Sequence, residues 1–251
     1  MQADGSGVVR LNGPESAQCP MWSPDGRTIV YSSLLRGDIF MIGADGSNLT
    51  QLTSGPRFED SPAWSPNQQY IVFSVSDGLA GGISALKPGQ PGETNLISSS
   101  FHSFWNPRWT SDGQHLAFSS NLEGNTEIYV VNVLATEQRI RLAGPVTRLT
   151  FDVHWDSSPD WSPDGSRIVF QSDRDGDPEI WVMRSDGSEQ MQLTHNRVGD
   201  SNPVWSPDGT RILYTSERDG GVDVFLMNAD GSETINLTNS PYWEGCASWL
   251  R

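Results

Sequence analysis

Cysteine and long apolar runs are scarce in this sequence of 251 residues. Two cysteines are too few for a disulfide scaffold, and their spacing does not fit a zinc site. No apolar run reaches the length of a transmembrane segment, so we expect no membrane insertion. The first residues, MQADGSGVVRLNG, lack the basic and apolar regions of a signal peptide, so export is not encoded in the chain as given.

Positive charge is also in short supply. The sequence has 16 basic and 31 acidic residues, a formal net charge of −15, and almost no lysine. Because nucleic-acid phosphates are bound by a cationic face, we expect no nucleic-acid binding from this acidic protein. A protein partner with a basic segment suits the charge, and so does a cation.

Motifs typical of enzymes are missing as well. The sequence contains no Gly-x-Ser-x-Gly nucleophile elbow, no phosphate-binding loop and no His-Glu-x-x-His zinc motif. Of the four histidines, His115 and His195 fall in ordinary strand-start and loop positions. We therefore expect a protein without catalytic activity.

The sequence does contain an internal repeat, marked by tryptophan at a fixed place. WSPDG occurs three times, and WSPNQ and WTSDG are degenerate copies of it. Spacings of 42 to 52 residues are typical of β-propeller blades rather than of helical or leucine-rich arrays. The repeat tryptophans are Trp22, Trp64, Trp109, Trp161, Trp205 and Trp249.

Each unit has the pattern of four short strands joined by tight turns. A proline stands two residues before the tryptophan in five units, and an Asp-Gly turn or a variant of it follows the tryptophan. Apolar residues then alternate, an acid opens most third strands, and Leu-Thr ends most units. Four-stranded units of this period predict an all-β propeller. Because one blade cannot bury both of its faces, we expect the tryptophans to pack between blades.

Two of the units carry a family resemblance. PDWSPDGSRIVFQSDRDGDPEIWVMRSDGSEQMQLT at 159–194 and PVWSPDGTRILYTSERDGGVDVFLMNADGSETINLT at 203–238 resemble the WD-like repeat of TolB-type β-propellers. This resemblance spans nearly the whole chain and implies a bacterial, non-catalytic propeller that acts as a protein-interaction or ligand-binding scaffold. It also implies a periplasmic or extracellular location.

The fold does not decide the function, so the resemblance leaves alternatives open. Similar blades occur in propeller domains attached to peptidases, which makes the propeller portion of a larger enzyme one alternative. A carbohydrate-binding or metal-dependent lyase-like propeller is the other.

Blade counting predicts a single propeller domain over 1–251 with six blade positions. The segments 3–12 and 244–251 match only the end and the start of a unit, so we expect them to share a partial sixth blade. A ring that closes on five blades is the alternative. Because MQADGS aligns with the inside of a unit, we interpret the chain as a segment of a longer repeat array. The complete blades are expected over about 17–53, 59–97, 104–150, 156–194 and 200–238.

The two cysteines bear on this closure. Cys19 and Cys246 each lie three residues before a repeat tryptophan, in the first and the last unit. In a closed ring these inner strands are neighbours, and a Cys19–Cys246 disulfide requires Cα atoms roughly 4.4–6.8 Å apart. Two buried free thiols are the alternative interpretation.

The segment before each tryptophan is expected at the mouth of the central channel, on one face of the ring. Carboxylates recur there, with aromatic residues and two histidines close by. This pattern favours a site for a basic protein segment, a cation or a sugar. Alternatively, each acid caps backbone N–H groups at the start of an inner strand. The candidate rim residues are Phe58, Glu59, His102, Phe104, Trp105, His154, Trp155, Asp156, Asp200, Trp243 and Glu244.

The stretch DRDGDPE at 173–179 is similar to a calcium loop, but the template fails. An EF-hand loop that began at Asp173 would need glycine at its sixth position and glutamate at its twelfth, where Arg184 stands. Aligned with the other units, the stretch is the turn between the second and third strands, so we expect no cofactor. A second interpretation lets Asp173, Asp175 and Asp177 hold calcium or another divalent cation loosely.

Overall fold

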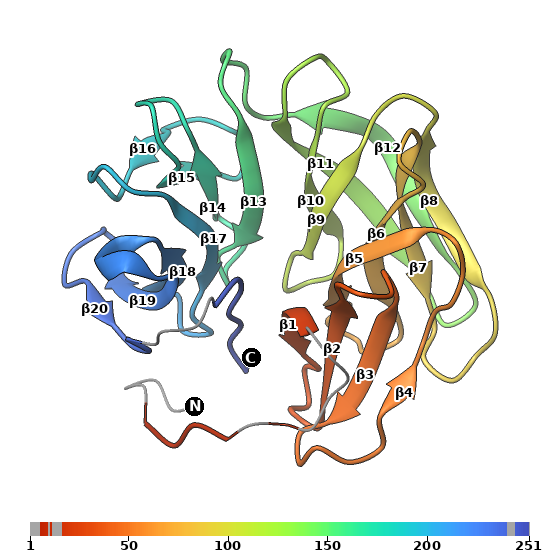
Figure 1. Ribbon diagram of the computed structural model, residues 1–251. Helices are drawn as coiled ribbons and strands as arrows, with labels where there is room; N and C mark the ends of the chain where they lie inside the picture. The colour runs from red at the N-terminus through yellow and green to blue at the C-terminus, as the bar shows by residue number, and fades with distance from the viewer. Residues whose placement is uncertain (1–5, 10, 12–16, 240–243, 251) are drawn as a thin grey trace.

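The computed structural model describes residues 6–9, 11, 17–239 and 244–250, and its sheets form a ring (Figure 1). The ring has five sheets of four antiparallel strands, as expected for propeller blades. The first blade comprises β1 (Ala17–Trp22), β2 (Thr28–Ser33), β3 (Ile39–Gly43) and β4 (Thr50–Gln51), and the second β5 (Phe58–Trp64), β6 (Ile71–Ser76), β7 (Gly81–Leu86) and β8 (Glu93–Ser99). The third comprises β9 (Phe104–Trp109), β10 (His115–Ser120), β11 (Glu127–Ala135) and β12 (Ile140–Arg148), and the fourth β13 (Asp156–Trp161), β14 (Arg167–Ser172), β15 (Glu179–Arg184) and β16 (Met191–Gln192). The fifth comprises β17 (Asp200–Trp205), β18 (Arg211–Ser216), the 3-10 turn η1 (Arg218–Gly220), β19 (Asp223–Asn228) and β20 (Ile235–Asn236).

The first strand of each blade lies nearest the centre of the ring, where it contacts the first strand of the next blade (Figure 1). Successive strands then run outward in chain order. Within the described part of the chain, no helix is long and apolar enough to cross a membrane.

The prediction of a sixth, shared blade is wrong. The structure has five blades, and residues 6–9, 11 and 244–250 form no strand. The physical reason is that the flanking segments match only the outermost and innermost strands of a unit. Without the two middle strands between them, the backbone groups of these segments have no ladder to join.

The C-terminal segment nevertheless occupies the place where a sixth blade would begin (Figure 1). The Glu244 N–H donates to the Val222 carbonyl at 3.0 Å, just as the Asp200 N–H donates to the Pro178 carbonyl at 2.7 Å. Trp249 packs against a buried cluster of the fifth blade. The segment therefore docks on the fifth blade as an inner strand would, but without strand pairing.

Each inner strand is interrupted at the same place. The residue three positions before the tryptophan has a positive φ of 45° to 53° in all five blades, and the register of each inner strand shifts there. The next residue is always proline, which has no N–H to donate to the ladder, so a bulge is the natural place for it. The residues with positive φ are Cys19, Ser61, Asn106, Ser158 and Asn202.

The predicted place of the tryptophans between blades is confirmed for Trp64, Trp109, Trp161 and Trp205, whereas Trp22 packs on its own blade. Trp205 is fully buried among Val169 and Ile180 of the preceding blade. Trp161 packs in the same way on Ile128 of the third blade. Such faces hold the ring together because each blade covers the apolar side chains of its neighbour.

The turn after each tryptophan is built by its own side chains. In the fourth blade the Ser162 hydroxyl donates to the Asp164 carboxylate at 2.5 Å and accepts the Arg167 N–H at 3.0 Å. The Ser166 N–H donates to the same carboxylate at 3.1 Å, while Gly165 takes a φ of 70° that an L side chain rarely adopts. The hydrogen bond from Ser162 lowers the pKa of Asp164 to about 2. This network accounts for the Ser-Pro-Asp-Gly sequence.

Candidate functional site

The two sides of the ring are made of different connections. Because strands alternate in direction, the connections between blades and the turns between second and third strands share one side, which we call the loop face. The remaining turns share the other side, the turn face. The loop face comprises residues 34–38, 52–57, 77–80, 100–103, 121–126, 149–155, 173–178, 193–199 and 217–222, with the first residues of the inner strands at its edge.

The predicted carboxylates lie beneath the loop face rather than on it. Asp156 and Asp200 are fully buried, and Glu59 is 2% exposed. Arg174 reaches Asp156 at 2.6 Å, and Arg218 reaches Asp200 at 2.9 Å. A third pair, Arg57 and Glu59, spans 3.2 Å. Each of these acids thus meets an arginine of the protein itself.

Burial changes the pKa of one of these acids, Asp156. It raises the pKa of Asp156 to about 6, although hydrogen bonds from Ser172 and Arg174 act in the opposite direction. An acid with this environment serves the packing of the blade, because an outside ligand cannot reach it without displacing Arg174.

The third blade replaces the ion pair with an apolar pair. Phe104 stands at the position of Asp156 and is 2% exposed. Leu122 stands at the position of Arg174 and packs against the same apolar cluster as Phe104. The third and fourth blades thus fill the same two positions with an apolar pair and with an ion pair. Two more of the predicted rim residues lie in the C-terminal part of the chain. Glu244, at the repeat position of Asp156, is half-buried. Trp243 lies outside the described residues.

The acid that opens the third strand also has a structural task. The Thr194 hydroxyl donates to Glu179 and accepts the Ile180 N–H at 2.9 Å. Burial raises the pKa of Glu179 to about 7. The same arrangement recurs at Glu127 with Thr150 and at Asp223 with Thr238. It explains why the units end in Leu-Thr.

The DRDGDPE turn positions a neighbouring loop. Asp173 accepts the Trp155 N–H at 2.7 Å, and Asp175 accepts the Gln192 side-chain amide at 2.5 Å. The described residues contain no group of three or more His, Cys, Asp or Glu side chains that could hold a metal ion. The cation at Asp173, Asp175 and Asp177 stays a prediction.

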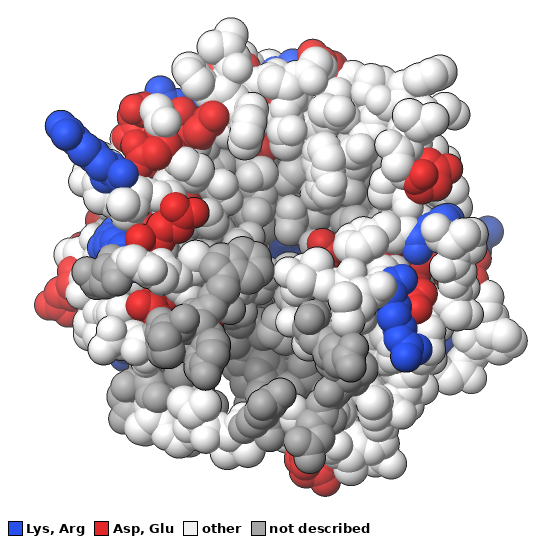
Figure 2. All heavy atoms as spheres, in the orientation of Figure 1, with Lys and Arg blue, Asp and Glu red and all other residues white. Residues whose placement is uncertain are grey.

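Exposed apolar side chains gather on the loop face. Of the sixteen large apolar side chains that are exposed among the described residues, nine lie there or at its edge. In the face-on view of Figure 2, acidic side chains gather over the fourth blade, whereas the surface over the third blade carries few charges. The nine are Leu34, Leu35, Phe58, Leu79, Phe101, Trp105, Phe151, Val153 and Trp155.

The connection 149–155, between β12 and β13, presents three of these side chains on a fixed backbone. The Asn125 amide donates to the Asp152 carbonyl at 2.9 Å and also reaches the His154 carbonyl. The Arg148 guanidinium lies 5.0 Å from the centre of the Phe151 ring. Trp155, held through its N–H by Asp173, leaves 62% of its surface exposed. Ordered backbone beneath exposed rings is a suitable arrangement for contact with a partner.

The other predicted rim residues lie around the second and third blades. His102 Nδ1 lies 3.1 Å from the Asn121 carbonyl, and Phe101 beside it is 86% exposed. Trp105 is 37% exposed and Phe58 is 44% exposed. Phe58 rests on Gly37, whose φ is 66° and where an added Cβ would lie 2.7 Å from the ring. His102 and His154 lie in different connections: His102 contacts the turn between β10 and β11, whereas His154 faces Asp152 of its own connection at 3.6 Å.

Sequence reasoning overlooked the arginine partners and several of the exposed side chains. Arg174 and Arg218 share a repeat position, which was a usable signal for their pairing with Asp156 and Asp200. Phe101 and Phe151 were findable as apolar residues in connections, where apolar side chains have no strand face to cover.

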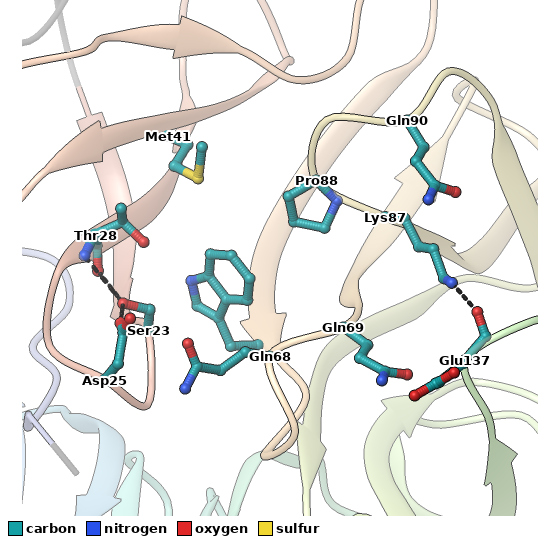
Figure 3. A pocket seen from close by; sticks show the side chains of 11 residues that line it. Ser23, Asp25, Thr28, Met41, Gln68, Gln69, Lys87, Pro88, Gln90 and Glu137 are labelled. Carbon is teal, nitrogen blue, oxygen red and sulfur yellow. Dashed lines mark hydrogen bonds between the residues drawn. The ribbon is translucent and has the colours of Figure 1, made fainter.

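Two cavities away from the loop face differ in what they can hold. A hollow of about 510 Å³ on the turn face lies between the first and second blades, and Glu137 of the third blade also lines it (Figure 3). Its polar groups largely bind one another: Lys87 reaches the Glu137 carbonyl, and Ser23 bridges Asp25 and Thr28. At the axis, a space of about 20 Å³ holds at most one water molecule. The axis therefore offers no room for a ligand at that level.

Comparison with known proteins supports the repeat-based resemblance. A family model described as the TolB beta propeller domain matches residues 86–194 and 156–249. An uncharacterized protein of Agrobacterium fabrum is 29% identical over 189 residues, covering 74% of this chain. The chain spans only 61% of the length of that relative.

Solved structures agree with this placement. A TolB candidate from Agrobacterium tumefaciens has a TM-score of 0.75 at 26% identity, covering 90% of this chain and 81% of the other. TolB from Acinetobacter baumannii has a TM-score of 0.68 at 22% identity, covering 87% and 51%. A puromycin-hydrolyzing peptidase of Mycobacterium tuberculosis and an oligogalacturonate lyase in complex with manganese, at 16% and 15% identity, share the fold alone. The family model covers more than half of the sequence, and the chain belongs to the TolB β-propeller family.

Proposed function

We propose that this propeller is a non-catalytic binding module that holds a protein segment on its loop face, with Phe151 and Trp155 as anchors. The observation that carries the proposal is the concentration of exposed apolar side chains on that face. Exposed apolar side chains gathered on one face mark interaction sites more often than single exposed residues do.

The chemistry of the loop face favours a protein over a sugar or a metal ion. Its exposed members are aromatic and aliphatic, and leucine and valine side chains offer no hydrogen bonds to sugar hydroxyls. Two of the carboxylates predicted for the rim, Asp156 and Asp200, are instead buried with arginines. Aromatic anchors on an ordered backbone are the usual source of binding energy in protein interfaces.

Net charge supplies a second preference for the partner. A protein with a formal charge of −15 attracts basic segments, and this attraction raises the association rate more than it raises affinity. We therefore expect the bound segment to combine apolar side chains with lysine or arginine. The role holds equally for a free-standing propeller and for one that forms part of a longer protein.

Panning a random peptide library displayed on phage against the immobilised protein tests the proposal. Affinities of the selected peptides are then measured by fluorescence polarisation for wild type and variants. We expect Trp155→Ala to weaken binding by at least about tenfold, a typical loss for an aromatic anchor. Met191→Ala is the matched control, since Met191 is 52% exposed on the outer strand β16, away from the loop face. Peptides that bind Trp155→Ala and Phe151→Ala as tightly as wild type would place the site elsewhere.

A further inference from the structure

Several of the residues three positions before the repeat tryptophans contact one another near the axis. The Asn106 amide donates to the Ser61 hydroxyl at 3.2 Å, and the Ser158 hydroxyl donates to the Asn202 amide oxygen at 3.3 Å. Asn202 in turn donates to the Gly245 carbonyl at 2.8 Å. Neighbouring inner strands are therefore linked at this level by short side chains.

The residues at this position in the first and last units are the two cysteines of the chain. Cys19 Sγ and Cys246 Sγ lie 2.6 Å apart, although 227 positions separate them in the sequence. Both are free thiols and both are only partly buried, and they line a cavity of about 890 Å³ between the first and fifth blades through which a small disulfide reagent can reach them. Each cysteine lies three residues before its tryptophan, which is the position at which other neighbouring inner strands contact each other.

This contact spans the joint between the C-terminal segment and the first blade. The segment 244–250 docks on the fifth blade through Glu244, Gly245 and Trp249 but pairs with no strand. Among the described residues, no β-ladder joins the last segment to the first blade. A covalent link at this point would close the ring where strand pairing does not.

We propose that Cys19 and Cys246 form an intramolecular disulfide that closes the ring by joining β1 to the C-terminal segment. The oxidant is a small disulfide such as oxidised glutathione. The Cys246 thiolate attacks it, forming a mixed disulfide and releasing one glutathione thiolate. The Cys19 thiolate then attacks Cys246 Sγ and releases the second. Two protein thiols are oxidised, one disulfide is reduced, and both thiol protons pass to the departing glutathiones.

The order of attack follows from the local environment. The hydrogen bond from Cys19 lowers the pKa of Cys246, and the positive charge of Arg108 acts in the same direction. That hydrogen bond, together with burial, raises the pKa of Cys19 well above its usual value. Cys246 is therefore the more acidic of the two thiols, and the thiolate is the form that attacks a disulfide.

The test is a thiol count on the full chain after treatment with oxidised glutathione, compared with a sample kept in reductant. Remaining thiols are alkylated with N-ethylmaleimide under denaturing conditions, and the intact mass is measured. We expect no alkylation of the oxidised protein, two additions to the reduced protein, and a monomer on a non-reducing gel. The oxidised form should melt higher by roughly 5–15 °C, because the link closes a very long loop.

Two variants sharpen the test. Cys19→Ser should keep glutathione as a mixed disulfide on Cys246, and Cys246→Ser should melt at the same temperature with and without reductant. Two alkylated thiols in the glutathione-treated wild type, a stable glutathione adduct on it, or a disulfide-linked dimer would each overturn the proposal. The wild-type comparison decides the matter even if either variant fails to fold.

Discussion

On the turn face the carboxylate of Asp164 is exposed and bonded to its own turn, whereas on the loop face the carboxylate of Asp156 is fully buried against Arg174. Apolar side chains show the opposite distribution, since Trp155, directly before Asp156, exposes 62% of its surface. One face therefore exposes charge on tight turns, and the other buries charge beneath exposed rings.

The difference follows the repeat. Serine, or threonine in the third blade, recurs with an Asp or Asn in the turn-face segments because the two side chains build the same turn in each blade. The position of Trp155 on the loop face, in contrast, holds Ser103 in the third blade and Gly199 in the fifth. What recurs maintains the architecture, and what varies from blade to blade is free to serve recognition.

The largest expected effect concerns the buried charge of the loop face. Asp156→Ala should lower the free energy of unfolding by about 3 kcal/mol, because it removes the buried partner of Arg174. Asp156→Phe combined with Arg174→Leu copies the Phe104 and Leu122 pair, so the double variant should cost at least about 1 kcal/mol less than the sum of the two single changes. Urea denaturation measures both. Additive costs would show that the two positions do not act as a pair.

The pH dependence of stability tests the same burial. The folded-state pKa is raised to about 6 for Asp156 and to about 7 for Glu179, above unfolded values near 4. Between the unfolded and folded pKa values, the folded protein therefore binds more protons than the unfolded protein. Its free energy of unfolding is highest at the acid end of this range and declines as the pH rises through 7. We expect a fall of about 2 kcal/mol from pH 5 to pH 8 in urea denaturation. Glu179→Gln should flatten the upper part of this curve, and Glu189→Gln, at an exposed turn-face acid, should not. A wild-type stability that rises over this range would contradict the burial argument.

A smaller effect is expected on the turn face. Ser206 accepts the Arg211 N–H at 2.9 Å and donates to Asp208 at 2.7 Å. Ser206→Ala should cost about 1 kcal/mol, seen as a drop in melting temperature of roughly 2–4 °C. Ser162→Ala, at the same position of the fourth blade, should give a matching value. Ser54→Ala, at an exposed serine outside these turns, is the control. Unequal costs at Ser206 and Ser162 would mean that the turn network depends on its blade.

Much of the fold was predictable because it repeats, and the failures lie where the repeat stops or depends on distant partners. The four strands of a blade and the packing of Trp205 against its neighbour follow from a periodic pattern. Counting units could not show that residues 244–250 would stay without a strand, because ladder formation depends on middle strands that are missing. The recurrence of carboxylates before the tryptophans was predictable from the sequence, but their burial was not. That burial depends on a partner elsewhere in the chain: Asp156 is paired with Arg174, 18 residues further on.

The smallest expected effect on stability is at the centre of the proposed site. Trp155 makes its described hydrogen bonds through its backbone, and its ring is largely exposed, so Trp155→Ala should change the free energy of unfolding by less than about 0.5 kcal/mol. Trp205→Ala, which removes a fully buried ring of the same size, is the reference. We expect it to lower the free energy of unfolding by about 3–5 kcal/mol. Urea denaturation of the two variants side by side makes the comparison. A loss above about 1 kcal/mol at Trp155 would make its ring part of the packing. An unchanged free energy of unfolding would show that the Trp155 ring does not stabilise the fold, as expected for a ring that serves binding.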